Sequence, residues 1–429
     1  MRIETSVSQI GLDSHRKFSK VTARNSDGTV AWRQRLDHVD RIEMREQLES
    51  WPKGTPVVLE GTFGWGWLSD ELRAAGLQPQ LASSRKVAAW RKARGLAKSD
   101  RSDADLLSEL PSEGERWWEV WLAPPEVRDQ REWLRYRLAL VRMQTSLKNR
   151  IHAILHRHGI LCEQSDLFGR DGRRFLNLLA APQKKDTQAN ASERPADQGT
   201  QVDTHAKDGG DIDAHAKDGS VVEAYRRLPD SGRATLTGYL KLLDHLRRQI
   251  AAATRAFRKQ VQASPAAMRL KTIPGIAWIL SYTILAEVGH IERFRSAKHL
   301  ASYSLLAPRA YDSGNEDDET PLGRHVGHVG RRMLKWAFIE AAHGAICRGG
   351  RFREIYDRRT NGGKRDKNRG CIVVAHELCR LSYVCWKKQV DYMVDPPPRP
   401  GIRRRRRHKL VSRSELGQPA AAMVAAAGC

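Results

Sequence analysis

The pattern of apolar and polar positions in the first part of the chain predicts β-strands that pair in sequence order. Alternating or continuous apolar residues indicate four strands, at 9–12, 17–23, 30–36 and 56–59. Turn residues between Asn25 and Gly28 join the second and third strands as a hairpin. Three antiparallel strands are therefore expected before the fourth strand begins.

Strands and helices then alternate along the chain. A helical pattern runs through Leu72, Leu81 belongs to a further strand, and residues 86–94 are helical again. Hairpin strands followed by this alternation have the order of an RNase H-type sheet. We therefore predict an α/β fold, an RNase H-type mixed-sheet domain, over residues 1–125.

Two later stretches carry an apolar stripe with helical spacing. Between 128 and 158, and again between 236 and 257, apolar residues recur at steps of three and four. We predict a long basic helix with its connector over 126–182 and an amphipathic, coiled-coil-like helix over 221–264. The stripes could pack together as a helical hairpin or against another subunit as a coiled coil.

The remaining segments differ from these in composition. Residues 183–220 are polar and contain His-Ala-Lys-Asp-Gly twice, starting at His205 and at His215, which predicts a disordered low-complexity insertion. A mainly helical C-terminal domain is predicted over 265–393. The segment 394–429 contains an unbroken run of arginines and is predicted to be a basic, disordered tail.

The net charge indicates what the chain binds. Lys and Arg number 74 against 50 Asp and Glu, which leaves +24 at pH 7. A polyanion is the natural partner of such a protein, and nucleic acid is the first candidate. The chain has neither a long apolar run nor a signal-peptide core, so we expect no membrane association and a cytoplasmic location. Its six cysteines form no Cys-x-x-Cys pair, which argues against zinc and disulfide frameworks.

Acidic residues fall where the predicted elements would bring them together. Asp13 and Glu60 each end a predicted strand, and the carboxyl ends of neighbouring parallel strands share one edge of a sheet. If a helix begins near Ser99, then Asp100 and Asp103 lie on one face of its first turn. Such carboxylates could hold Mg²⁺, as a pair of ions about 4 Å apart in a phosphoryl-transfer site. Acidic side chains in a first helical turn are also stabilised by the helix dipole alone, so their presence there does not require a bound metal.

Two short motifs in the second half have both a functional and a plain interpretation. Pro274 and Gly275, between apolar residues, resemble the hairpin of helix-hairpin-helix modules, whose backbone N–H groups hold a DNA phosphate. A simple turn before a helix would look the same. Ser313 and Gly314 form a turn signal, and a serine hydroxyl is a poor nucleophile until a base or a metal draws off its proton.

Together, the motifs resemble insertion-sequence transposases that have a RuvC-like N-terminal domain and a serine-containing C-terminal domain. The segments that carry the resemblance are 12–13, 58–62, 98–104, 305–309, 312–314 and 330–342. The resemblance implies that Asp13, Glu60, Asp100 and Asp103 bind Mg²⁺ and that Ser313 is the nucleophile. The candidate nucleic-acid contacts are Lys98, Arg101, Gly275, Arg309, Arg331, Arg332 and Lys335.

The same resemblance implies a DNA transposase or recombinase that cuts and exchanges strands through a phosphoserine intermediate. Its expected partners are the DNA of the element ends and the target, a structured guide RNA, and further copies of the chain, one of which supplies Ser313 to the site of another. The sequence departs from the family at 327–329, where a basic residue is usual, and in the acidic loop 316–319, which speaks against DNA contacts there. Two alternatives remain open, a RuvC-like junction nuclease in which water attacks and a non-catalytic nucleic-acid scaffold.

Overall fold

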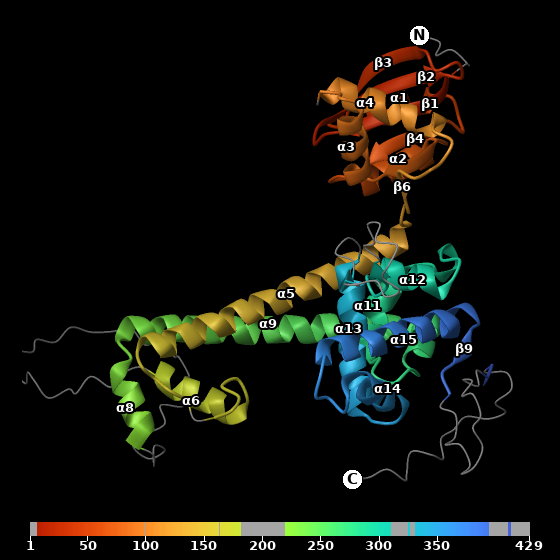
Figure 1. Ribbon diagram of the computed structural model, residues 1–429. Coiled ribbons are helices and arrows are strands. Elements are labelled where there is room, and N and C mark those ends of the chain that lie inside the picture. Colours follow the sequence, from red (N-terminus) through yellow and green to blue (C-terminus); the bar gives the residue numbers. More distant parts are fainter. Residues whose placement is uncertain are drawn as a thin grey trace, which may run out of the picture. The chain divides into compact units, whose positions relative to one another are not determined.

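The structure is a computed structural model that divides into two compact units, Met1–Gln130 and Arg131–Cys429 (Figure 1). The residues that it describes are 7–97, 99–162, 164–181, 219–309, 325–326, 331–393 and 411–412. The predicted insertion 183–220 and the predicted tail 394–429 lie almost wholly outside these residues. In the described part of the chain, no helix is both long enough and apolar enough to cross a membrane.

The first unit is built on a six-stranded mixed sheet with the strand order β3-β2-β1-β4-β5-β6. The strands are β1 (Val7–Ser14), β2 (Phe18–Asn25), β3 (Val30–Asp37), β4 (Pro56–Glu60), β5 (Gln78–Ala82) and β6 (Glu119–Val120). The first three strands are antiparallel, β4 and β5 run parallel to β1, and β6 is antiparallel at the edge. The predicted strands and the predicted mixed sheet of an α/β unit are confirmed.

Helices cover both faces of this sheet. They are α1 (Arg41–Glu49), α2 (Trp65–Ala74), α3 (Ser84–Ala93) and α4 (Asp100–Glu109), followed by the 3₁₀ turn η1 (Leu110–Ser112). Leu12 and Leu59 pack with the apolar residues of α1 and α2, whereas Val58 packs with those of α3 and α4. Because neighbouring residues of a strand point to opposite faces, each face of β4 has its own core.

Helix α4 lies directly on β1 because Gly11 has no side chain. A Cβ atom at Gly11 would lie 2.2 Å from the backbone nitrogen of Ser108 and 2.3 Å from the carbonyl oxygen of Ala104. The start of α4 is held by Ser99, whose hydroxyl accepts from the Ser102 N–H in a capping box. The predicted helix start near Ser99 is therefore confirmed.

The second unit contains a long helical hairpin. Its helices are α5 (Pro125–Arg157), α6 (Arg170–Ala180), α8 (Gly219–Arg227) and α9 (Asp230–Ala263). Helices α5 and α9 run side by side (Figure 1), and Arg137 Nε donates to Thr254 Oγ1 at 3.0 Å between them. Ile151 of α5 and Leu240 of α9 belong to one apolar cluster, which α6 and α8 complete. The two predicted apolar stripes thus pack within one chain, as the hairpin interpretation expects.

The rest of the second unit is mainly helical, as predicted. Its helices are α10 (Pro265–Leu270), α11 (Trp278–Val288), the 3₁₀ turn η2 (Ile291–Arg293), α12 (Ala297–Tyr303), α13 (Arg332–Cys347), α14 (Arg351–Thr360) and α15 (Lys367–Lys387). Two-residue strands make up two small ladders, β7 (Pro308–Arg309) with β8 (His325–Val326), and β9 (Val390–Asp391) with β10 (Val411–Ser412). Leu334, Phe338 and Leu378 lie in its continuous apolar core.

Gly275 has a packing role in this core. Its φ of +86° is one that glycine adopts readily, and a Cβ atom there would lie 2.0 Å from the carbonyl oxygen of Ala341 in α13. The Pro274–Gly275 turn therefore allows the backbone before α11 to touch α13. This close approach explains the glycine without a phosphate, and a nucleic-acid contact from it stays a prediction.

Substituting Gly11 tests the close contact between β1 and α4. We expect Gly11→Ala to destabilise the first unit by about 3 kcal/mol, because the added carbon overlaps the backbone of α4. Urea unfolding followed by hydrogen exchange of β1 and α4 measures the loss. Gly114→Ala is the matched control, because a Cβ atom there meets nothing within 4 Å. Equal unfolding midpoints for the two variants would contradict the role of Gly11.

Candidate metal centre

Two elements of the first unit bring acidic side chains to one end of β1. Asp13 is near the end of this strand, and Asp100 and Asp103 are in the first turn of α4. Glu60 ends the neighbouring strand β4, whose Leu59 pairs with Leu12 in the parallel register. Asp13 and Glu60 therefore follow paired positions at the same edge of the sheet, as the sequence predicts.

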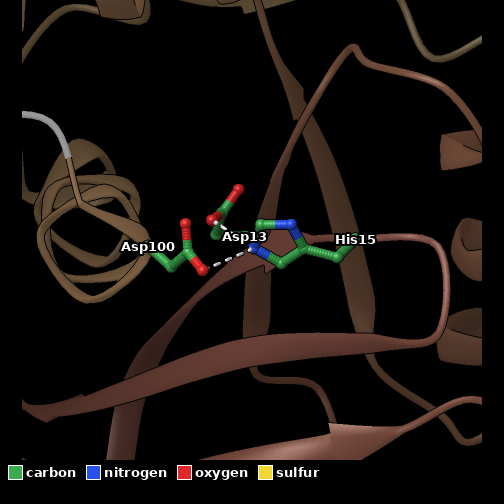
Figure 2. Close-up of side chains that lie close together, drawn as sticks. All are labelled: Asp13, His15 and Asp100. Atoms are coloured by element: carbon green, nitrogen blue, oxygen red, sulfur yellow. Dashed lines mark ion pairs between the residues drawn. The ribbon is translucent and has the colours of Figure 1, made fainter.

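A histidine faces two of these acids (Figure 2). The Nε2 atom of His15 is 3.1 Å from Asp13 Oδ2 and 3.4 Å from Asp100 Oδ2. One ligand atom from each of the three residues lies within 4.8 Å of the others. Glu60 and Asp103 lie outside this close group of three, although their charges reach it. Sequence reasoning did not select His15, and its signal was its place two residues after Asp13.

The electrostatics of Asp13 show that the acids share one environment. Burial raises the pKa of Asp13 from 3.8 to about 6, the charge of His15 opposes this rise, and the charges of Asp103, Asp100 and Glu60 add to it. Only 13% of the Asp13 side chain is exposed. An ionised Asp13 is therefore costly in the protein alone and would be stabilised by a nearby cation.

Asp103 and Asp105 have basic partners that set them apart from Asp13. Arg91 Nη1 donates to Asp103 Oδ1 at 2.6 Å, which fixes this carboxylate and leaves its second oxygen for another ligand. Arg33 binds both oxygens of Asp105, at 2.9 Å and 3.0 Å, and Thr22 donates to it as well. Burial alone would raise the pKa of Asp105, but these hydrogen bonds lower it below its ordinary value. Asp105 is thus a structural acid, in keeping with its place outside the predicted motif.

The predicted nucleophile and the predicted nucleic-acid contacts differ in whether the structure describes them and in how exposed they are. Ser313 lies outside the described residues, as does Lys98 of the first unit, and the side chain of Arg309 is not described. Arg331 Nε donates to Tyr303 Oη at 2.9 Å and lies 3.7 Å from Glu287 Oε2, so this guanidinium already has partners within the fold. Arg332 is exposed, Lys335 is half-buried, and Arg101 of the first unit is exposed.

The donor set at the end of β1 fits a divalent cation. Carboxylate oxygens are the ligands that Mg²⁺ prefers, and an imidazole nitrogen is a common ligand of transition metals. The Nε2 atom of His15 is buried and forms no hydrogen bond with the described residues, although it lies at ion-pair distance from Asp13 and Asp100. A buried carboxylate and a buried ring nitrogen that face one another are both satisfied when a cation lies between them. The residues therefore fit a metal ion.

Segments in both halves of the chain match models of known protein families. A family model for the DEDD transposases of IS110 type matches residues 10–160, which include all four candidate acids. A second model, described as transposase of the IS116/IS110/IS902 family, matches residues 267–357. These matches together cover more than half of the chain.

Similar proteins agree with the family models. The transposase for insertion sequence element IS1111A of Coxiella burnetii is 23% identical over 89% of this chain and 90% of its own length. The pilin gene-inverting protein of Moraxella bovis is 34% identical over 27% of this chain and 34% of its own length. An uncharacterized 43.6 kDa protein of the insertion element IS110 in Streptomyces coelicolor is 33% identical over 24% of this chain and 25% of its own length.

The order of the two matched domains and the near full-length similarity to an insertion-sequence transposase agree with the acidic site at the end of β1. The chain belongs to the IS110/IS116/IS902 family of insertion-sequence transposases.

Proposed function

We propose that the chain is a DNA recombinase that cuts and rejoins strands of its element at a metal site made by Asp13, Glu60, Asp100 and Asp103. The observation that supports this most is the group of Asp13, His15 and Asp100, which lies within the part matched by the DEDD model. The burial of Asp13 and the charges of Asp103, Asp100 and Glu60 raise the pKa of Asp13, and perturbed carboxyl groups of this kind are common at functional sites. Asp105 is held at both oxygens by Arg33, whereas Asp13 and Asp100 share the single ring nitrogen of His15.

The strand order of the first unit supports an RNase H or RuvC-like interpretation. Antiparallel β1, β2 and β3 are followed by the parallel strands β4 and β5, and β1 lies in the middle of the sheet. In open α/β sheets, ligands bind beyond the carboxyl ends of such central strands. The proposed substrate phosphate therefore binds at the edge where Asp13 and Glu60 end their strands.

Three acids of the proposed site, Asp13, Asp100 and Asp103, have roles that follow from their surroundings. Asp13 and Asp100 hold the cation, which when bound would supply positive charge to the phosphate and to the departing 3′ oxygen. Asp103 is fixed by Arg91 at one oxygen, and its second oxygen is the proposed ligand atom. Gly11 allows α4 to lie directly on β1 through Ala104 and Ser108, which keeps the helix that carries Asp100 and Asp103 beside Asp13.

Ser313 is the proposed nucleophile. Its oxygen attacks phosphorus, the bond from phosphorus to the 3′ oxygen breaks, and a phosphoserine ester conserves the bond for rejoining. The serine proton passes to a base, and the 3′ oxygen leaves with a proton as a hydroxyl. The net charge of +24 suits the binding of DNA and of a structured guide RNA. We also propose a homo-oligomer, in which another copy supplies Ser313, and a location with the DNA of the cytoplasm.

A denaturing gel tests the serine chemistry. Wild type is incubated with Mg²⁺, DNA carrying the ends of its own element, and RNA transcribed from the element's flanks. We expect DNA linked to protein for wild type and no linkage for Ser313→Ala or Asp13→Ala, because the first lacks the nucleophile and the second a metal ligand. Ser302→Ala, which changes an exposed serine, is the matched control and should keep the linkage.

Two other outcomes of this gel would favour the junction nuclease or the non-catalytic scaffold. Cleaved DNA without linkage, persisting in Ser313→Ala, would favour the junction nuclease in which water attacks. An absence of cleavage by wild type with both nucleic acids present would favour a non-catalytic scaffold.

The pKa of Asp13 predicts how metal binding depends on pH. Because its pKa is about 6 in the folded protein and 3.8 ordinarily, Asp13 stabilises the metal-free fold at low pH and loses this contribution as the pH rises through 6. Asp13→Asn should therefore stabilise the metal-free protein at pH 7.5 by about 1–3 kcal/mol. Mg²⁺ should raise the melting temperature of wild type at pH 7.5, much less at pH 5, and not that of Asp13→Asn.

Thermal unfolding in EDTA and in Mg²⁺ measures both effects. Asp129→Asn is the control, since this aspartate is exposed on α5, and it should respond to Mg²⁺ as wild type does. The electrostatic account of Asp13 fails if Asp13→Asn is the less stable protein in EDTA at pH 7.5. Equal Mg²⁺ shifts in wild type and Asp13→Asn would count against the metal site.

A further inference from the structure

His15 is the residue of the site that the acidic motif leaves unexplained. Its ring nitrogen Nε2 lies 3.1 Å from Asp13 Oδ2 and 3.4 Å from Asp100 Oδ2, and the ring points between these two carboxylates (Figure 2). A histidine at the surface normally directs its nitrogen toward water. Here the Nε2 atom is buried and faces the two carboxylates at ion-pair distance without a hydrogen bond to any described residue, although a third of the side chain is exposed.

The fold holds the His15 ring in this direction. The ring lies 4.7 Å from that of Phe18, with 32° between their planes, and the His15 N–H donates to the Phe18 carbonyl at 2.8 Å. These two contacts fix the turn between β1 and β2 and the side of the turn on which the ring lies. Its position is thus set by β1 and β2 themselves, before any ligand binds.

The distances from the His15 nitrogen to the two carboxylate oxygens match those between neighbouring ligand atoms around one metal ion. In an octahedral site with metal–ligand distances of about 2.1 Å, neighbouring ligand atoms are about 3.0 Å apart, a value that follows from the right angle between them. The Nε2 atom of His15 is 3.1 Å and 3.4 Å from the two carboxylate oxygens. A cation placed among the three atoms could therefore bind all of them without a large movement of β1 or α4.

We propose that His15 Nε2 is a ligand of the cation bound by Asp13 and Asp100. This inference rests on the proposed function and adds to it a nitrogen donor beyond the four acids. Imidazole suits transition metals, whereas Mg²⁺ prefers oxygen ligands and keeps several waters. His15 therefore shifts the selectivity of the site away from Mg²⁺ and toward transition-metal ions, of which Mn²⁺ is the paramagnetic probe, and it is a specificity-determining residue for the metal.

A second role for His15 leads to different results. A protonated ring could lie between the carboxylates as a counter-charge that a cation displaces. In that case its removal would leave metal affinity unchanged or raise it, because the cation would no longer compete with the ring. A ligand role predicts the opposite, a loss of affinity that is larger for Mn²⁺ than for Mg²⁺.

Electron paramagnetic resonance of Mn²⁺ bound to the full-length protein distinguishes these roles. At a Mn²⁺ concentration below that of the protein, a directly bound imidazole gives a ¹⁴N modulation of the spin echo. We expect this modulation in wild type, and its loss in His15→Asp and His15→Asn while Mn²⁺ still binds. His156→Ala, which removes an exposed ring on α5, is the matched control and should keep the modulation.

Titrations with MnCl₂ and with MgCl₂ give the second readout. We expect the Mn²⁺ affinity of His15→Asn to fall by at least about tenfold, because mutating even a residue that only hydrogen-bonds to a metal ligand lowers metal affinity by about that factor. The Mg²⁺ affinity of His15→Asp should be at least that of wild type, because the new ligand is an oxygen. Circular dichroism and melting curves of each variant check that the first unit is folded.

Failure of this inference and failure of the proposed function give different results. Mn²⁺ that binds wild type and is lost in Asp13→Ala, but shows no ¹⁴N modulation, would overturn the role of His15 and leave the acidic site intact. A modulation that persists in folded His15→Asn would do the same. Wild type that binds no Mn²⁺, or binds it equally well as Asp13→Ala, would overturn both.

Discussion

The constraint on which the site depends is the burial of Asp13 at the end of β1, close to other acids. Burial and the neighbouring charges of Asp103, Asp100 and Glu60 raise the pKa of Asp13 to about 6, so its charged form is costly in the protein alone. Backbone contacts keep the acids there. Gly11 allows α4 to lie on β1, and the Ser99 capping box fixes where α4 begins. A site with this cost suits a ligand that removes it, and a divalent cation does so.

The basic residues around the site limit which acids can act. Arg91 holds one oxygen of Asp103, while Arg33 holds both oxygens of Asp105. An acid held at one oxygen can still bind a cation, whereas one held at both cannot do so without losing its partner. The same helix therefore carries both kinds of acid within one turn, and side-chain pairing separates them.

Much of the first unit could be predicted from the sequence, for identifiable reasons. Strand alternation and the Asn25–Gly28 turn identify β2 and β3, and Ser99 identifies the start of α4, because these signals are local. Helix α1 buries only Met44 and Leu48, and β6 is two residues long, so neither has a pattern that stands out. His15 could not be assigned, since the ring direction depends on Phe18 and on a turn whose geometry the sequence does not state. Pro274 and Gly275 were open to two interpretations, and contact with α13 explains the glycine.

The helices of the second unit are held together by apolar packing more than by charged contacts. Helices α5 and α9 pair within the chain, and the core around Leu334 and Phe338 supports the start of α13. Arg331 at that start binds Tyr303 and lies close to Glu287, so a basic residue of the family motif also has a structural task. The sequence alone could not show whether Arg331 contacts nucleic acid or stabilises the fold.

The proposed chemistry requires the carboxylates at the end of β1 to bind a divalent cation. An anomalous difference map from a crystal of the full-length protein soaked in MnCl₂ tests this binding. We expect a manganese peak within about 2–2.5 Å of carboxylate oxygens of both Asp13 and Asp100. Ordered side chains at these positions with no peak between them, at a Mn²⁺ concentration that saturates the protein, would contradict it.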